Sequence, residues 1–209
     1  LVEAGSGLAN QGIASSSGIH PGYAASTLVS EYNDLESVKG ILESNAGEVA
    51  AVIVEPIAGN MGVVLPVDGF LEGLRSLTRE HQCLLIFDEV ISGFRVALGG
   101  AQSTFGVTPD ITCLGKIIGG GFPVGAYGAS AEIMSEVAPL GPMYQAGTLS
   151  GNPVAMAAGI ATLDELAKPG VYEDLQAATD KLANGVTNVF AKAGVPAVIN
   201  RACGLMTVF

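Results

Sequence analysis

The sequence has little positive charge. Nine Lys and Arg residues stand against twenty Asp and Glu residues, which leaves a formal net charge of −11 at neutral pH. Nucleic acids and anionic membrane surfaces are bound by clustered Lys and Arg side chains. The composition therefore argues against both as partners. An acidic surface that keeps a soluble protein in solution is enough to explain the charge.

Cysteines and long apolar runs are also scarce. Cys83, Cys113 and Cys203 are odd in number, far apart and embedded in apolar runs. This pattern favours buried free thiols in a reducing compartment over disulfides or a metal site. No unbroken apolar stretch approaches the roughly 20 residues of a membrane helix, and no signal peptide is visible. We therefore expect neither a metal nor a membrane partner.

Hydrophobic residues are abundant, at 49% of the chain, and they follow a regular plan. Short apolar runs alternate with longer periodic stretches, which is typical of an α/β fold with a mostly parallel sheet flanked by helices. We expect strands at residues 49–54, 83–87, 111–114 and 124–127.

Helix signals lie between and after these runs. Asp68 is expected to cap a helix whose apolar face is formed by Phe70, Leu71, Leu74 and Leu77. Asn152 and Pro153 predict the start of a second helix, and a third should run from about Val171 to Gly194. From Val195 onward we expect a strand of a separate, smaller domain.

Lys116 and Asp88 are the leading candidates for chemistry. Lys116 lies between apolar residues and a glycine run, where little water should reach it, and loss of water favours the neutral, nucleophilic amine. Asp88 ends an apolar run, at the carboxyl end of an expected strand, where open α/β sheets bind ligands. A carbonyl-trapping amine and a carboxylate that keeps a pyridine nitrogen protonated are the minimum for a pyridoxal-phosphate enzyme. A surface lysine and a capping aspartate remain alternatives.

Four segments resemble the class III aminotransferases. Residues 87–95 resemble the signature of the class, and residues 115–126 are similar to its cofactor-lysine segment. Residues 54–62 and 141–153 are most similar to the glutamate-1-semialdehyde 2,1-aminomutase family within that class. Members of this family are considerably longer at both ends, so we expect the chain to be an internal fragment.

The resemblance implies a fold and a domain plan. The fold would be that of the aspartate-aminotransferase type (fold type I), built around a large cofactor-binding domain. Residues 1–194 would then be part of this domain, and residues 195–209 would begin the small C-terminal domain. The cofactor would be pyridoxal 5′-phosphate, alternating with pyridoxamine 5′-phosphate.

The resemblance also implies site residues. Lys116 would form a Schiff base with the cofactor and then shuttle protons, and Asp88 would pair with the pyridinium nitrogen. Val90 would pack on one ring face, although a core valine would look the same. Thr148 would reach the cofactor phosphate of a neighbouring subunit, which implies a homodimer with shared sites. Asn60 replaces the glutamate of many ω-transaminases, and a neutral residue suits an enzyme with one substrate.

Residues 4–26 are rich in Gly and Ser and poor in large apolar side chains. Such a stretch cannot bury enough surface to be rigid, so we expect a mobile loop. From composition alone, an ordinary surface linker is the simpler explanation. In the aminomutase family a gating lid lies here and retains the diamine intermediate, which is a known role of closing loops. Ser6 matches a family position near the substrate, with a flexible-loop serine as the alternative.

Three hypotheses for function follow. The first is the conversion of glutamate-1-semialdehyde to 5-aminolevulinate by intramolecular amino transfer. This reaction would serve tetrapyrrole (porphyrin, chlorophyll, heme) synthesis, in a bacterial cytoplasm or a plastid stroma. The second is an ω-transaminase that uses an external amino donor. The third is a doubly wound binding module in which Lys116 and Asp88 are structural. In the first two, the isolated chain should be inactive, because the phosphate loop and the substrate arginine lie upstream in the family.

Overall fold

The computed structural model describes residues 17–209 and confirms the α/β class. Its main sheet has four strands in the order β1-β2-β3-β4. The first three, β1 (Ala51–Val54), β2 (Leu84–Asp88) and β3 (Ile111–Gly115), are parallel to one another. Strand β4 (Gly125–Ala129) runs antiparallel to β3, because the connection over residues 116–124 is too short for the crossover that a parallel neighbour needs. All four expected strands are confirmed.

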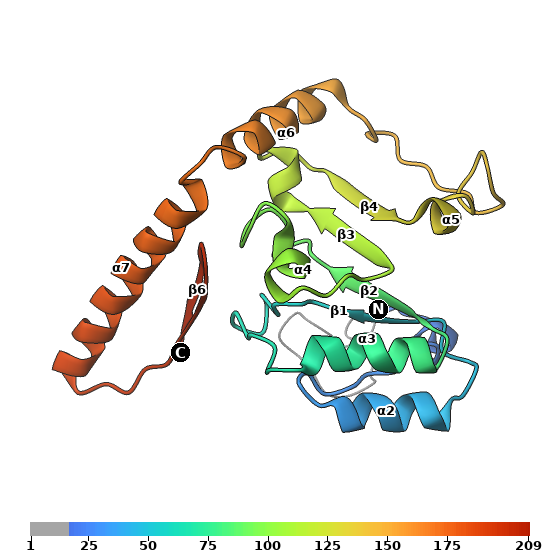
Figure 1. The fold of residues 1–209 in the computed structure, drawn as a ribbon, viewed down its shortest axis with the longest axis horizontal. Coiled ribbons are helices and arrows are strands. Elements are labelled where there is room, and N and C mark those ends of the chain that lie inside the picture. Colours follow the sequence, from blue (N-terminus) through green and yellow to red (C-terminus); the bar gives the residue numbers. More distant parts are fainter. Residues whose placement is uncertain (1–16) are drawn as a thin grey trace.

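The core lies between one face of this sheet and two helices. Leu85 and Phe87 of β2 are fully buried on that face. Helix α3 (Phe70–Glu80) packs against β2, and α2 (Leu35–Ser44) packs against α3, so both helices lie on the same side of the sheet in Figure 1. Of the predicted apolar face of α3, Phe70, Leu71 and Leu74 are buried and Leu77 is half-buried, and all four join β2 in one cluster.

The prediction that Asp68 caps α3 is wrong. The residue before the helix is Gly69, at φ 82°, and no side chain caps the first turn. The Phe70 N–H already donates to the Val67 carbonyl at 3.0 Å, and this turn leaves Asp68 outside the helix. Asp34 instead performs this role for α2, where its Oδ1 accepts from the Ser37 N–H at 3.0 Å.

Two long helices follow the sheet. Helix α6 (Pro153–Leu166) begins as predicted, with Asn152 Oδ1 accepting from the amides of its first turn. Helix α7 (Val171–Ala193) ends at Gly194, also as predicted. In Figure 1 these helices carry the chain around the outside of the sheet, with α7 leading away from it.

The chain closes on a small hairpin. Strands β5 (Ile199–Ala202) and β6 (Leu205–Val208) pair antiparallel in a sheet of their own, so the expected strand begins at Ile199 rather than Val195. Asn200 Nδ2 donates to the Gly62 carbonyl at 2.9 Å, which ties the hairpin to the loop after β1. Assignment of residues 195–209 to a second domain stays a prediction.

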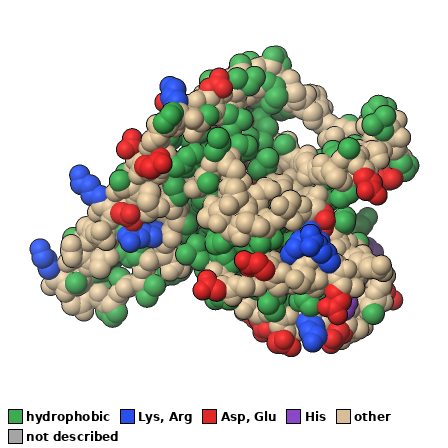
Figure 2. Space-filling view, in the orientation of Figure 1, with side chains coloured by type: hydrophobic (Ala, Val, Ile, Leu, Met, Phe, Trp, Pro, Cys, Tyr) green, Lys and Arg blue, Asp and Glu red, His purple; other side chains and the backbone are tan. Residues whose placement is uncertain are grey.

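Four short elements complete the described chain: α1 (Pro21–Ala25), α4 (Gly100–Phe105), α5 (Ala131–Met134) and the 3₁₀ helix η1 (Lys116–Gly119). No helix within residues 17–209 has the length and apolar character needed to cross a membrane. The cysteines are free, with Cys83 buried and the other two half-buried. On the face shown in Figure 2, Lys and Arg side chains do not gather into one continuous patch.

Candidate active site

Three neighbouring parallel strands end at the same edge of the sheet, and a charged residue lies at each end. Glu55 follows β1, Asp88 is the last residue of β2, and Lys116 follows the last residue of β3. Because these strands are parallel, their carboxyl ends lie side by side, where open α/β sheets bind ligands. The fold therefore places the two predicted residues, Asp88 and Lys116, at one edge.

Lys116 has an unusual backbone. Its φ of 47° is left-handed, a conformation that costs a non-glycine residue about 1–2 kcal/mol. Such outliers cluster at functional sites. The segment is held from behind by α6, because a Cβ on Gly120 would lie 2.5 Å from the Ala158 carbonyl oxygen.

The Lys116 side chain is exposed, so the prediction that this chain shields it from water is wrong. Ile117 and Ile118, the apolar neighbours on which that prediction rested, are themselves half-buried. They follow Lys116 in η1, a turn away from the strand, and so they do not enclose it. The amine is left accessible at the end of β3.

Asp88 is half-buried, and its two oxygens differ. Oδ1 accepts a hydrogen bond from the Val90 N–H at 3.0 Å, which fixes the carboxylate and begins the turn after β2. Among residues 17–209, no donor is bonded to Oδ2. In the described chain no helix follows β2 directly, because α4 begins only at Gly100, so the helix-capping alternative for Asp88 is wrong. Asp88 holds a turn instead, and Oδ2 is left able to accept a hydrogen bond from a ligand.

Val90 lies against the backbone that leads into Lys116. Its Cγ1 is 3.2 Å from the position that a Cβ on Gly115 would occupy. Val90 is half-buried, so part of its side chain remains available for contact. The structure thus brings together Asp88, Val90 and Lys116, the three residues that the sequence placed around one ring.

Glu55 adds a charge to which the sequence analysis gave no role. Its Oε2 accepts from the Gly59 N–H at 3.0 Å. Desolvation raises the pKa of Glu55, the Gly59 hydrogen bond opposes this, the Asp88 charge raises the pKa further and the Lys116 charge lowers it. Glu55 therefore lies close enough to interact electrostatically with both Asp88 and Lys116. Its position at the carboxyl end of a strand, like that of Asp88, was the available signal.

The remaining predicted residues do not join this cluster. Asn60 is exposed in the turn after Gly59, and Thr148 is exposed on the segment between α5 and α6 that loops away from the sheet (Figure 1). Within the described chain, no hydrogen bond links either one to Lys116 or Asp88. Ser6 lies outside the described residues. Of the predicted mobile stretch 4–26, the structure describes residues 17–26, which include α1, and mobility stays a prediction.

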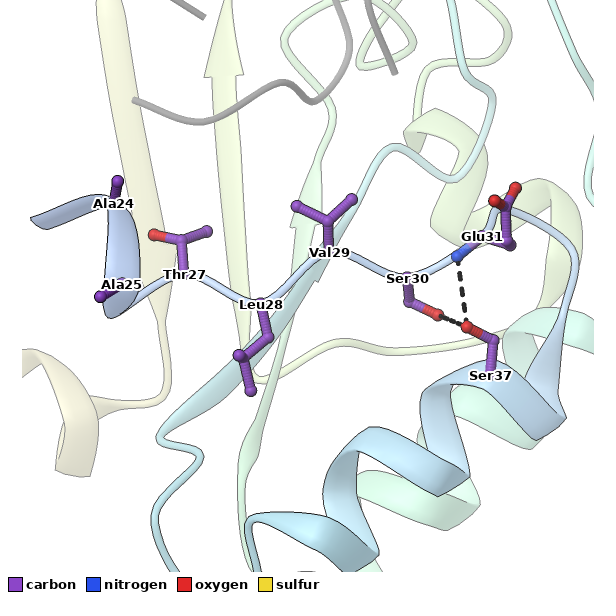
Figure 3. A pocket seen from close by; sticks show the side chains of 8 residues that line it. All are labelled: Ala24, Ala25, Thr27, Leu28, Val29, Ser30, Glu31 and Ser37. Atoms are coloured by element: carbon purple, nitrogen blue, oxygen red, sulfur yellow. Dashed lines mark hydrogen bonds between the residues drawn. The ribbon is translucent and has the colours of Figure 1, made fainter. Parts of the chain in front are cut away.

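A hollow elsewhere on the molecule is unrelated to this cluster. Figure 3 shows it beside residues 24–31, where the Ser30 hydroxyl bonds to the Ser37 hydroxyl at 2.9 Å. None of the predicted site residues lines it. In the described part of the chain, no group of three or more His, Cys, Asp or Glu side chains is placed to hold a metal ion.

Comparisons with known proteins find relatives along the whole chain. Residues 14–209 match the family Aminotransferase class-III. The chain is 58% identical over its full length to glutamate-1-semialdehyde 2,1-aminomutase 2 of Brevibacillus brevis, and 56% identical to the aminomutase of Desulforamulus reducens. It covers 49% and 48% of these relatives, so it spans about half their length.

Solved structures share the fold. An omega-transaminase from Sphaerobacter thermophilus matches with a TM-score of 0.88 and 39% identity, over 93% of this chain and 45% of that one. A glutamate-1-semialdehyde-aminomutase from Pseudomonas aeruginosa matches with a TM-score of 0.79 and 34% identity, over 92% and 45%. A variant of the Pseudomonas enzyme, solved in complex with PMP, also matches with a TM-score of 0.79, at 33% identity over 92% and 45%.

Proposed function

Because the chain belongs to the class III aminotransferase family, we propose that the whole protein is a pyridoxal-phosphate-dependent aminomutase. It would convert glutamate-1-semialdehyde to 5-aminolevulinate by intramolecular amino transfer, for tetrapyrrole synthesis. The observation that carries this proposal is the cluster of Lys116, Asp88 and Val90 at adjacent strand ends. The substrate is suggested by the high identity to aminomutases along the whole chain.

The residues at the sheet edge fit this cofactor. When bound, pyridoxal phosphate supplies an electron sink that stabilises a carbanion beside its ring. Asp88 would accept a hydrogen bond from the ring nitrogen through its free oxygen, and its charge would keep that nitrogen protonated. Val90 would contact the ring. Lys116 would hold the cofactor through its amine and, once released, carry a proton to or from the substrate carbon.

A homodimer with shared sites is part of this proposal. Thr148 lies on a segment that is exposed along its length and carries large apolar side chains. Leu140, Tyr144 and Leu149 are 81%, 83% and 64% exposed. Contiguous exposed apolar surface marks interaction sites. This supports a second copy of the chain as the occupant, with Thr148 reaching the partner's cofactor phosphate.

Other features of the proposal rest on the family alone. Asn60 would serve an enzyme that has a single substrate, and Ser6 with the 4–26 loop would gate the site. Residues 1–194 and 195–209 would belong to the large and the small domain. The relatives compared above are bacterial, which supports the cytoplasm as the compartment.

An ω-transaminase is the second candidate. The TM-score of 0.88 to the Sphaerobacter omega-transaminase exceeds the 0.79 found for the aminomutase structures. Such an enzyme would regenerate its amine-loaded cofactor from an external donor. An aminomutase would not, because it returns the amino group within one catalytic cycle.

The two candidates are separated by one assay. The whole protein, loaded with pyridoxamine phosphate, is given glutamate-1-semialdehyde with no amino donor, and 5-aminolevulinate is measured against time. We expect many turnovers per site from the wild type and almost none from Lys116→Ala. A transaminase would instead aminate about one equivalent of the semialdehyde to the diamine and stop, and addition of an external amino donor would restart formation of the diamine rather than of 5-aminolevulinate.

A further inference from the structure

Glu89 lies between the two proposed ring-binding residues, Asp88 and Val90, yet it is fully buried. A buried carboxylate is costly unless it is hydrogen-bonded. Glu89 continues the alternation of Leu85 and Phe87, so its side chain lies on the buried side while its neighbours are half-buried. Glu89 has no part in the chemistry proposed for Lys116 and Asp88.

The Glu89 carboxylate accepts four hydrogen bonds. Oε2 accepts from the Ala101 N–H at 2.6 Å and from the Ser92 hydroxyl at 2.9 Å. Oε1 accepts from the N–H and the side-chain Nε2 of Gln102, at 3.0 and 3.2 Å. The carboxylate therefore joins the turn after β2 to the first turn of α4. Charge-assisted bonds of this kind are among the strongest in proteins.

The Glu89 backbone is fixed as well. Its N–H donates to the Cys113 carbonyl of β3 at 2.9 Å, and its carbonyl accepts from the Gly93 N–H at 2.8 Å. Gln102 Nε2 also donates to the Thr112 hydroxyl at 3.3 Å, which links the carboxylate's partner back to β3. Glu89 is thus held on both sides of the turn that carries Asp88 and Val90.

Helix α4 is shaped around this carboxylate. Gly100, its first residue, has φ 68°, and a Cβ there would lie 2.6 Å from Glu89 Oε2. A side chain at Gly100 would displace the carboxylate. The absence of one lets the amides of the first turn converge on a negative charge, which the helix N-terminus favours.

We propose that Glu89 is a positioning residue for the cofactor site. It anchors the turn after β2 to α4 and β3, and so holds the Asp88 carboxylate and the Val90 side chain where the ring would lie. Within this turn the Val90 N–H donates to Asp88 Oδ1 at 3.0 Å. That Glu89 positions groups that bind the cofactor ring rests on the proposed function. That Glu89 holds the turn after β2 does not.

The test compares Glu89→Gln with Asp110→Asn in the whole protein. Glutamine has the same shape, but its NH₂ would face donors such as the Gln102 N–H. Asp110 is the matched control, because its Oδ2 accepts from the Leu85 N–H at 2.7 Å and pairs with Arg75 at 2.9 Å, at the opposite end of the same strand. Both variants thus replace a carboxylate that secures β2 by the corresponding amide.

Two quantities are measured for each variant, after thermal melting has confirmed folding. The first is hydrogen exchange of the Val90 amide in cofactor-free protein, and the second is the Kd for pyridoxal phosphate from visible absorbance. Glu89→Gln should speed Val90 exchange at least about tenfold and weaken cofactor binding by about 10–100-fold, a loss of the size seen when groups that orient the ligands of a metal ion are removed. Asp110→Asn should leave both values unchanged.

Several outcomes would overturn the proposal. Wild-type Val90 exchange and wild-type cofactor affinity in Glu89→Gln would do so, because Glu89 would then not position the site. Equal losses in Asp110→Asn would also do so, because the effect would then be a general structural one. If Glu89→Gln does not fold, Ser92→Ala removes a single donor to Oε2 and should shift both values by a few-fold in the same direction. A wild-type protein that binds no cofactor would refute the proposed function, and Val90 exchange would still decide whether Glu89 holds the turn.

Discussion

The substitution Asp88→Asn separates the two roles that the structure gives to this residue. Asparagine keeps an Oδ1 that can accept from the Val90 N–H, now at 3.0 Å, so the turn should survive. The negative charge is lost, and with it the charge-assisted bond proposed for the ring nitrogen. Hydrogen bonds to charged groups contribute about 1.5–3 kcal/mol, so kcat should fall by roughly ten- to more than a hundredfold. The free energy of unfolding should change by less than about 0.5 kcal/mol.

The assay is 5-aminolevulinate formation by the whole protein, alongside urea unfolding of the same samples. Asp88→Ala is the matched comparison, because it removes the acceptor for Val90 as well as the charge. It should lose activity like Asp88→Asn and, in addition, about 1 kcal/mol of stability, the usual contribution of one hydrogen bond. Wild-type kcat in Asp88→Asn would refute the reasoning and leave Asp88 only the role of holding the turn.

Three other perturbations test separate parts of the account. Lys116→Ala should still bind the cofactor, seen by absorbance, but should lose about 10²–10⁴-fold in kcat, and near-normal turnover would remove Lys116 from the mechanism. Glu55→Gln should change the pH dependence of stability. Desolvation raises the Glu55 pKa above its ordinary 4.5, so the stability that protonated Glu55 contributes is present below 4.5 and is lost as pH rises through the folded-state pKa. Urea unfolding should show this loss in the wild type and not in Glu55→Gln, and equal slopes would contradict it. Gly120→Ala should destabilise the fold by about 1–3 kcal/mol more than Gly194→Ala, because both are left-handed but only a Cβ at Gly120 meets the Ala158 carbonyl. Equal thermal shifts would show that α6 does not hold the Lys116 segment closely.

Local sequence signals predicted most of the fold. Apolar runs identified the three parallel strands, because parallel strands read as continuous apolar segments. The antiparallel strand β4 is mostly exposed and was expected instead from its place after the glycine run. Asn152 and Pro153 specified the start of α6 because a cap is a local interaction. Asp88 and Lys116 were found because each lies at the end of such a run, within a segment that resembles a known family.

Features that depend on distant contacts were not predicted. Glu89 has carboxylate partners in α4, which only the folded chain brings to it. Glu55 gained its place from the pairing of β1 with β2. The exposure of Lys116 was missed because flanking apolar residues do not reveal the direction of a turn. Thr148 lies apart from the cluster in a single chain, since the phosphate that it is proposed to bind belongs to a second copy.

Chemical mapping of the cofactor attachment site tests the central claim most directly. The whole protein is loaded with pyridoxal phosphate, reduced with borohydride, digested and analysed by mass spectrometry. We expect one pyridoxyl group per chain, on the peptide that contains Lys116, and none in stoichiometric amount on Lys39, Lys168, Lys181 or Lys192. Stoichiometric label on any other lysine, or a protein that takes up no label, would contradict the site described at the ends of β2 and β3.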